Sequence, residues 1–248
     1  MTDPSDRAPC ALVTGGGTRL GAAIARTLAA AGYDLVVHYA TSRAGAQAVA
    51  AGAEALGRRA VVVGADLRDR GAIDALVAAT LDFGGGRLDA LVHNAGVYER
   101  VAPEALDDDA LERALDVNVR APYRLTLRLR PALERARGCV VAITDVAADR
   151  PWRDHLPYSV SKAALAQLVR GWAIALAPLV RANAVAPGAV LPAAEDVADA
   201  ADAAALTASV PLGRFGEADD VARAVLFLLQ NGYVTGHALR VDGGRSLV

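Results

Sequence analysis

The chain has 248 residues, of which 54% are hydrophobic, and a formal net charge of −2 with a pI near 6.1. The length fits one large α/β domain or two small ones, and the charge argues against a general binder of nucleic acids or polyanions. The N-terminal string MTDPSDRAP has no apolar signal core, and no apolar run reaches the ~18 residues of a membrane span. We therefore expect a soluble, cytoplasmic protein.

The two cysteines, Cys10 and Cys139, have no metal-ligand spacing and lie in apolar runs. We expect buried free thiols and no metal site.

Short apolar runs alternate with longer alanine-rich stretches along the whole chain. Strands are predicted at 11–14, 34–39, 60–64, 90–93, 139–144, 181–185 and 238–241. Helices are predicted near 20–31, 43–56, 70–83, 104–134, 157–177 and 217–230. This alternation is typical of a parallel sheet with helices on both faces. Since no linker divides the chain, we predict a single α/β domain over 1–248, in which the acidic, alanine-rich stretch Leu191–Ser209 is a short mobile helix acting as a lid.

A glycine-rich string, TGGGTRLG over residues 14–21, follows the first predicted strand and runs directly into a helix. Such a turn lets backbone amides and the helix N-terminus receive a pyrophosphate. Glycines often only shape a turn, but the position of this string at the first strand-to-helix junction favours a nucleotide site.

Lys162 is the single lysine among 26 basic residues. It lies four positions after Tyr158 in YSVSK, so the two side chains share one face of a helix. Lysine is a compact charge whose pKa responds to its surroundings, whereas arginine is a permanently charged planar fork. A cation here lowers the pKa of the neighbouring phenol. Taken alone, this spacing is more often an ordinary surface pair.

Further motifs follow in a fixed order. Asp66 follows the third predicted strand, and HNAG, residues 93–96, follows the fourth. Asn118 lies in a predicted helix, YSVSK follows the fifth strand, and the dipeptide at 187–188 follows the sixth. With the glycine turn, this order resembles the short-chain dehydrogenase/reductase family from about residue 9 to 245.

The resemblance implies a Rossmann fold with a seven-stranded parallel sheet and a bound nicotinamide nucleotide. It implies that Tyr158 is the general acid in reduction and that Lys162 lowers the pKa of Tyr158 and holds the nicotinamide ribose. Asn118 would hold a water that links Lys162 to solvent; the alternative is an amide that binds local backbone. Asp66 would accept from the adenine amino group or cap a helix, and Asn94 would bridge strands beside the cofactor.

The cofactor-binding residues that the resemblance implies are Gly15, Thr18, Arg19, Leu20, His38, Tyr39, Ser42, Arg43, Asp66, Leu67, Asn94, Ala95, Gly96, Thr144, Tyr158, Lys162, Pro187 and Gly188.

Two positions depart from the family pattern. Thirteen residues before the tyrosine, most members carry a serine that hydrogen-bonds a substrate carbonyl, and this chain has Asp145. A carboxylate suits an amine, an amide N–H or a ring nitrogen that gains a proton; the alternative is a drifted, inactive site. In the glycine turn, Arg19 replaces the middle glycine of TGxxxGxG. Its side chain is expected to cross the pyrophosphate toward the substrate.

The segment after the second predicted strand, LVVHYATSR, lacks the Asp or Glu that marks NAD preference. Ser42 and Arg43 are there instead and suit a 2′-phosphate, so we expect NADPH as the cofactor. The basic residue often found after HY is replaced by Ala40 and Thr41, which weakens this preference.

Arginine in the turn, HY after the second strand and aspartate in place of serine resemble the pteridine reductases and the bacterial dihydromonapterin reductases. These relatives often read N-A-S where this chain has N-A-G at 94–96. The resemblance implies reduction of a dihydropterin, such as dihydromonapterin, dihydrobiopterin or dihydrofolate. Catalysis is assigned to Asn118, Asp145, Tyr158 and Lys162. Substrate binding is assigned to Arg19, Tyr98, Asp145 and Tyr158, with Tyr98 stacking on the pterin and the pair at 152–153 at the rim.

Two other functions remain open. A general carbonyl reductase for a 3-oxoacyl thioester or a ketone fits the fold, but that reaction does not call for Asp145. A non-catalytic NADPH-binding sensor also fits, but a sensor does not need a proton relay. Apolar residues on wide faces at 110–134 and 158–177 indicate partner surfaces. Because matching helices of the family pair into dimers and tetramers, we expect a homotetramer.

Overall fold

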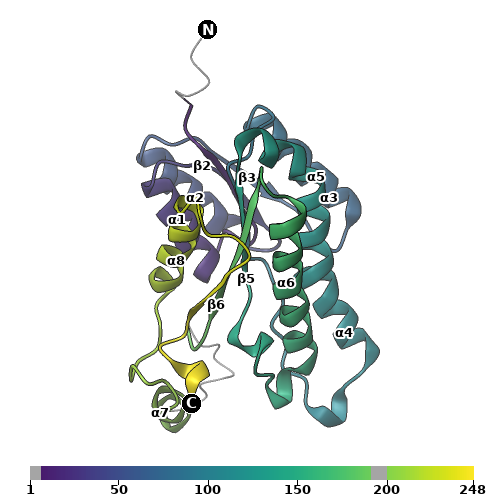
Figure 1. The fold of residues 1–248 in the computed structure, drawn as a ribbon, viewed down its shortest axis with the longest axis vertical. Coiled ribbons are helices and arrows are strands. Elements are labelled where there is room, and N and C mark those ends of the chain that lie inside the picture. The colour runs from purple at the N-terminus through teal and green to yellow at the C-terminus, as the bar shows by residue number, and fades with distance from the viewer. Residues whose placement is uncertain (1–6, 191–199) are drawn as a thin grey trace.

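Seven parallel strands form one sheet in the order β3-β2-β1-β4-β5-β6-β7 in the computed structural model, which describes residues 7–190 and 200–248 (Figure 1). The strands are β1 (Cys10–Val13), β2 (Asp34–Tyr39), β3 (Ala60–Gly64), β4 (Ala90–His93), β5 (Cys139–Ile143), β6 (Arg181–Pro187) and β7 (Ala238–Val241). Each strand lies within two residues of its predicted bounds, and the predicted Rossmann architecture is confirmed.

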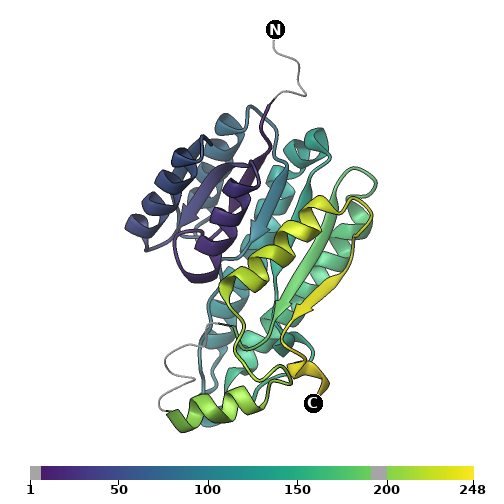
Figure 2. The ribbon, with the colours of Figure 1, turned by 90° about the vertical axis from the view of Figure 1, so that its left-hand side faces the viewer.

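Helices cover both faces of this sheet (Figures 1 and 2). They are α1 (Arg19–Ala30), α2 (Arg43–Ala55), α3 (Arg70–Phe83), α4 (Asp108–Leu115), α5 (Ala121–Ala136), α6 (Leu156–Ala175), α7 (Ala200–Ala208) and α8 (Ala218–Gln230). One apolar cluster joins the sheet to α1, α2 and α8, and a second joins it to α3, α5 and α6. In β1, Leu12 packs in the second cluster while Ala11 and Val13 pack in the first, because successive strand residues point to opposite faces.

The predicted continuous helix over 104–134 is wrong. A 3-10 turn at Pro103–Ala105 precedes α4, and a π-helical turn at Asp116–Arg120 separates α4 from α5. The carboxylate of Asp107 caps α4 by accepting from the amide of Ala110 at 2.7 Å. A π turn is wider than an α turn and is often found at a functional site. Here it carries Asn118, whose side chain is buried.

The predicted lid falls partly outside the described residues, which omit 191–199. The later part forms α7, close to the C-terminal end of the chain (Figures 1 and 2). Its role as a lid stays a prediction. Cys10 and Cys139 are both buried and unpaired. None of the helices in the described ranges is long and apolar enough to cross a membrane.

Candidate active site

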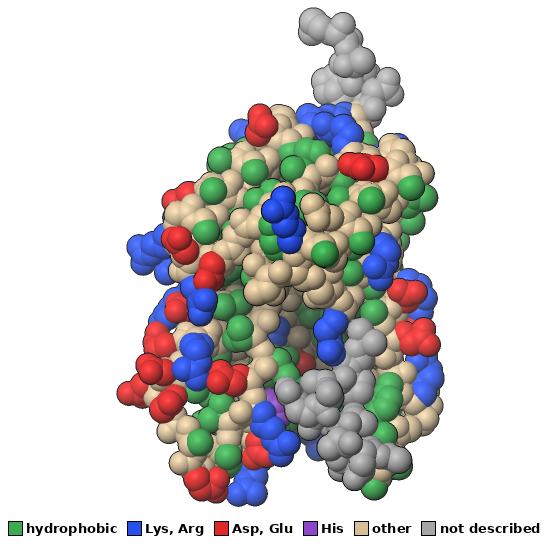
Figure 3. Space-filling view, turned by 180° about the vertical axis from the view of Figure 1, so that it is seen from behind, with side chains coloured by type: hydrophobic (Ala, Val, Ile, Leu, Met, Phe, Trp, Pro, Cys, Tyr) green, Lys and Arg blue, Asp and Glu red, His purple; other side chains and the backbone are tan. Residues whose placement is uncertain are grey.

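A cavity of about 1370 Å³ opens at the carboxyl ends of the strands, the edge where α/β sheets form their ligand sites. Its lining comes from the segments that follow β1 to β6, together with Leu206 of α7 and Arg245 near the C-terminus. Seen from behind, the surface is hollowed, with arginine side chains around the hollow, since the single lysine is buried (Figure 3).

Nearly all of the predicted site residues line this cavity. They are Gly15, Thr18, Arg19, Leu20, His38, Tyr39, Ser42, Asp66, Leu67, Asn94, Ala95, Gly96, Tyr98, Thr144, Asp145, Tyr158, Lys162, Pro187 and Gly188. Two predicted residues do not line it. Arg43 is exposed in the first turn of α2, next to Ser42, and Asn118 is buried behind the lining.

The glycine turn presents backbone to the cavity. Gly15 has φ +63, in the left-handed region that favours glycine, and a Cβ added to Gly21 would lie 2.1 Å from the Gly15 carbonyl oxygen. The Asn94 amide donates to the carbonyl oxygens of Thr14 and Gly15 at 3.0 and 3.1 Å, which ties β4 to the turn. Backbone amides and the start of α1 are thus held where a dinucleotide pyrophosphate fits.

Arg19, the first residue of α1, has φ +47. It replaces a glycine of the family pattern, and the left-handed backbone explains why glycine suits this position. An arginine here carries a local strain of about 1–2 kcal/mol relative to glycine. Strained backbone persists where a side chain has a use, and the Arg19 side chain lines the cavity.

His38, at the end of β2, supports the turn. Its Nδ1 accepts from the amide of Gly15 at 3.0 Å, so its Nε2 carries the proton and donates to the carbonyl of Ala65 at 3.0 Å. Burial lowers the pKa of His38 below its ordinary value of 6.5, which favours this neutral tautomer. The ring therefore positions the phosphate-binding backbone.

Asp66 already has a partner. Its carboxylate accepts from the Arg68 guanidinium at 2.7 Å, and this bond holds the pKa of Asp66 below its usual range. The pair is half-exposed at the cavity edge. Its expected role at adenine stays a prediction.

Tyr158, Asp145 and Lys162 meet at the floor of the cavity. The Tyr158 hydroxyl donates to Asp145 Oδ2 at 2.7 Å, and Asp145 Oδ1 accepts from the amide of Ala147 at 2.8 Å. Burial raises the pKa of Asp145, against the opposing effects of its hydrogen bonds and the nearby positive charges. The result is a buried carboxyl in direct hydrogen-bond contact with a phenol.

Lys162 lies beneath the Tyr158 ring, with Nζ 5.5 Å from the ring centroid. Its ammonium donates to the carbonyl of Ile143 at 2.8 Å. Burial lowers the pKa of Lys162 to about 8, while the charge of Asp145 opposes this effect. The ammonium is therefore a buried charge beside the phenol, in a place where its proton is held less tightly than in water.

Asn118 locks the loop after β4 onto α6. Its Oδ1 accepts from the amide of Val97 at 2.9 Å, and its Nδ2 donates to the Val97 carbonyl at 3.0 Å and to Ser161 Oγ at 2.9 Å. The side chain therefore binds local backbone, the alternative considered from the sequence, and the water relay stays a prediction.

Three aromatic rings, those of Tyr98, Trp152 and His155, gather around Tyr158. Tyr98 stacks on His155 at 4.5 Å between centroids and meets Tyr158 edge-on at 4.9 Å. Trp152 lies 6.5 Å from Tyr158 with the planes 25° apart. The site residues predicted from the sequence include neither His155 nor Arg245. The only local signal for His155 is its place between Trp152 and Tyr158.

The sequence matches the family model described as Enoyl-(Acyl carrier protein) reductase over residues 17–246. The 3-oxoacyl-[acyl-carrier-protein] reductase of Synechocystis is 33% identical over 242 residues, covering 96% of each chain. The structure of a short-chain dehydrogenase/reductase from Serratia marcescens has a TM-score of 0.89 at 33% identity, covering 96% of this chain and 98% of that one.

A second solved structure, a blue fluorescent protein from a metagenomic library in complex with NADPH, has a TM-score of 0.88 at 34% identity. The match covers 96% of this chain and 97% of the chain of that fluorescent protein. With the parallel sheet and the cleft at its carboxyl edge, these matches show that the chain is an NAD(P)-dependent oxidoreductase of the short-chain dehydrogenase/reductase family.

Proposed function

We propose that this protein uses NADPH to reduce a dihydropterin to its tetrahydro form. The observation that carries the proposal is the 2.7 Å hydrogen bond from Tyr158 to Asp145, where most members of the family have serine. A carboxyl bound to the general acid suits a reaction in which a ring nitrogen must gain a proton. It suits ketone reduction less well, since an ionised carboxylate repels the developing alkoxide.

The protonation state of Asp145 decides where the proton of Tyr158 points. When Asp145 is ionised, the Tyr158 hydroxyl is turned toward it and cannot point at a substrate. When Asp145 is protonated, it donates to the Tyr158 oxygen and leaves the phenol proton free for the substrate. Because burial raises the pKa of Asp145, the protonated form is accessible closer to neutral pH than for an exposed aspartate.

The nicotinamide nucleotide, when bound, supplies the hydride that the pterin carbon accepts. Tyr158 gives its proton to the adjacent ring nitrogen, and the ammonium of Lys162 stabilises the phenolate that remains. Asp145 then returns a proton to Tyr158 and regains its own from solvent. One hydride and one proton are added across the C=N bond, as the change from dihydro to tetrahydro requires.

NADPH is proposed over NADH because Ser42, the N-cap of α2, and Arg43, its first residue, offer a hydroxyl and a guanidinium for a 2′-phosphate. The metagenomic relative was solved with NADPH, which supports the proposal. In Arg43→Ala, kcat/KM with NADPH should fall while kcat/KM with NADH stays the same. An equal fall with both cofactors would assign Arg43 another role.

Turnover tests the substrate. NADPH oxidation is followed with dihydrobiopterin or dihydromonapterin and, in parallel, with an acetoacetyl thioester. Reduction of a pterin with the higher kcat/KM supports the proposal. Turnover of the thioester but of neither pterin rejects it.

Ketone reduction is the second candidate, because a curated relative is a 3-oxoacyl-[acyl-carrier-protein] reductase. The geometry around Asp145 counts against it. The neighbouring hydroxyl of Thr144 donates to the carbonyl of Val185 at 3.0 Å, so it is already engaged and does not replace the missing serine. A sensor without catalysis has no use for the bonded set of Tyr158, Asp145 and Lys162.

We also propose that the protein is a homotetramer. Large apolar side chains remain exposed on α5, α6 and α8, at Tyr123, Leu127, Val160 and Phe227. Such faces usually mark partner surfaces. Light scattering that gives a monomer of 25.5 kDa would reject this assembly.

A further inference from the structure

We propose that Arg245 forms a subsite for a carboxylate on the substrate, so that the protein favours pterins with an anionic tail. The inference rests on the proposed function for the pterin ring of the substrate. The recognition of a carboxylate by Arg245 is argued independently of that ring. The inference starts from a residue that was not among the predicted site residues.

Arg245 lines the same cavity as Tyr158 and Asp145. Its guanidinium lies over the Trp152 ring, with Cζ 5.4 Å from the centroid, and Trp152 in turn faces Tyr158. The charge of Arg245 also acts on Asp145, although the structure has no ion pair between these two residues. The guanidinium of Arg245 thus lies near Tyr158 and Asp145 but does not form an ion pair with Asp145.

Three other arginines that line the cavity are bound to carboxylates. Arg68 pairs with Asp66 at 2.7 Å, Arg100 with Asp154 at 2.9 Å and Arg153 with Glu104 at 3.7 Å.

Within the part of the chain that the structure describes, the guanidinium of Arg245 makes the ring contact with Trp152 and no side-chain hydrogen bond or ion pair. A guanidinium has five donors in a fixed fork and no acceptor. The donors of Arg245 are therefore available to a ligand in the cavity, and a carboxylate matches the fork with two parallel bonds.

The turn that carries Arg245 is rigidly built. The carboxylate of Asp242 accepts from the amides of Gly244 and Ser246 at 3.0 and 2.8 Å, and the amide of Arg245 donates to the Asp242 carbonyl at 3.1 Å. Gly243 and Gly244 have φ +62 and +88, and a Cβ on Gly243 would lie 2.5 Å from Val210.

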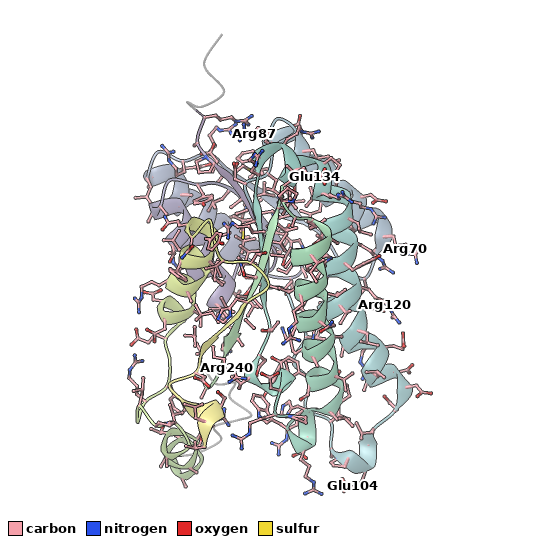
Figure 4. The ribbon with its side chains drawn as sticks, in the orientation of Figure 1. Arg70, Arg87, Glu104, Arg120, Glu134 and Arg240 are labelled. Carbon is pink, nitrogen blue, oxygen red and sulfur yellow. The ribbon has the colours of Figure 1, made fainter. Side chains whose placement is uncertain are left out.

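Two arginines, Arg150 and Arg240, fasten this turn to the body of the same chain. Arg150 donates to the carbonyls of Ser246 and Val248. Arg240 of β7, labelled in Figure 4, pairs with Asp149 at 2.8 Å. The side chain of Arg245 is therefore presented to the cavity from a fixed support, as a binding residue needs to be.

A carboxylate fits better than a phosphate at this place. The phosphate-binding features, the glycine turn and the start of α1, lie at the other end of the cavity, after β1. A planar carboxylate can lie beside the Trp152 ring and meet the guanidinium edge to edge. Among dihydropterins, dihydrofolate carries carboxylates on its tail and dihydrobiopterin carries none. A comparison of these two substrates therefore distinguishes recognition of the carboxylate from recognition of the pterin ring.

The test measures binding of folate and biopterin, the oxidised forms of the two substrates, to protein saturated with NADP⁺ by calorimetry. Arg245→Gln should lower the ratio of folate affinity to biopterin affinity by about 10-fold to 100-fold, the range of a charge-assisted hydrogen-bonded pair. Arg245→Lys, which keeps the charge without the fork, should give an intermediate ratio. Arg223→Gln, which removes an exposed charge from α8, is the matched control and should leave the ratio unchanged.

An unchanged ratio in Arg245→Gln, or an equal loss for both pterins, overturns the subsite, because Arg245 would then act through Trp152 or Asp145. If wild-type protein binds neither pterin, the proposed function fails separately. The subsite is then tested with 4-carboxybenzaldehyde and its methyl ester, which share a reacting carbonyl. In that case, the inference is overturned if wild-type protein does not prefer the carboxylate to the methyl ester, or if Arg245→Gln keeps that preference.

Discussion

The two ends of the cavity are built in different ways. The nucleotide end consists of backbone, held by glycines without room for a Cβ and by the side chains of Asn94 and the buried His38. The substrate end consists of side chains from separate segments: Tyr98, Asp145, Trp152 and Arg245. Substitutions at the first end should act on every substrate alike, whereas substitutions at the second should change one substrate relative to another.

Lys162→Arg should have the largest effect, because Lys162 lies where the two ends meet. The site is buried and holds a compact ammonium against the Ile143 carbonyl. A guanidinium is larger and stays charged at every working pH. We expect kcat to fall by about 100-fold or more.

Steady-state kinetics on folded protein, verified by circular dichroism, measures the effect. The control is Arg170→Lys on the exposed side of α6, which should leave kcat unchanged. Wild-type activity in Lys162→Arg would show that this position needs only a positive charge.

Asp145→Ser should change the activity toward a pterin and toward a thioester in opposite directions. Removal of the carboxyl takes away the partner of the Tyr158 hydroxyl, so pterin reduction should fall by at least about 10-fold. Reduction of an acetoacetyl thioester should rise, because a neutral hydroxyl then replaces the carboxylate. The ratio of the two kcat/KM values is the measurement. Unchanged pterin turnover would mean that Asp145 has no part in proton transfer.

Arg19→Gly should raise the stability of the protein and weaken substrate binding. Glycine relieves the left-handed backbone at φ +47 but is more flexible in the unfolded chain, so the free energy of unfolding should rise by a net amount of up to about 1 kcal/mol. The KM of the substrate should rise because a side chain that lines the cavity is gone.

Arg19→Ala is the matched control, since it removes the same side chain and keeps the strain. Denaturant unfolding and kinetics on both variants separate the two effects. Equal stabilities of the glycine and alanine variants would contradict the account of strain.

The smallest effect is expected at His38, as a pH dependence of NADPH affinity. The neutral ring accepts from the Gly15 amide, and burial lowers the pKa of His38 below 6.5. The support of the turn is therefore present at neutral pH and is lost as the pH falls through this lowered pKa. Fluorescence titration should show affinity declining a few-fold on acidification, about the loss of one hydrogen bond. His38→Asn, which keeps an acceptor that does not titrate, should remove this dependence.

The strands and the nucleotide end were predictable because their signals are local. A strand buried on both faces reads as an apolar run, and the glycines of the turn stand next to one another. The π turn at Asn118 was not predictable, because its sequence continues the helical periodicity of α4 and α5. Arg245 was not predictable either, since its place depends on how the turn after β7 packs against the loop after β5.

The burial of the single lysine gives this protein an unusual chemical property. Amine-selective reagents find no ε-amine on the surface of the described chain, because Lys162 is buried on the cavity floor. With its pKa lowered to about 8, this amine is also more often unprotonated, and hence more nucleophilic, than an ordinary lysine. Acylation at this side chain should therefore proceed only through the cofactor cleft. The extent of acylation of the peptide that contains Lys162, measured by mass spectrometry after brief labelling, then reports whether that cleft is filled.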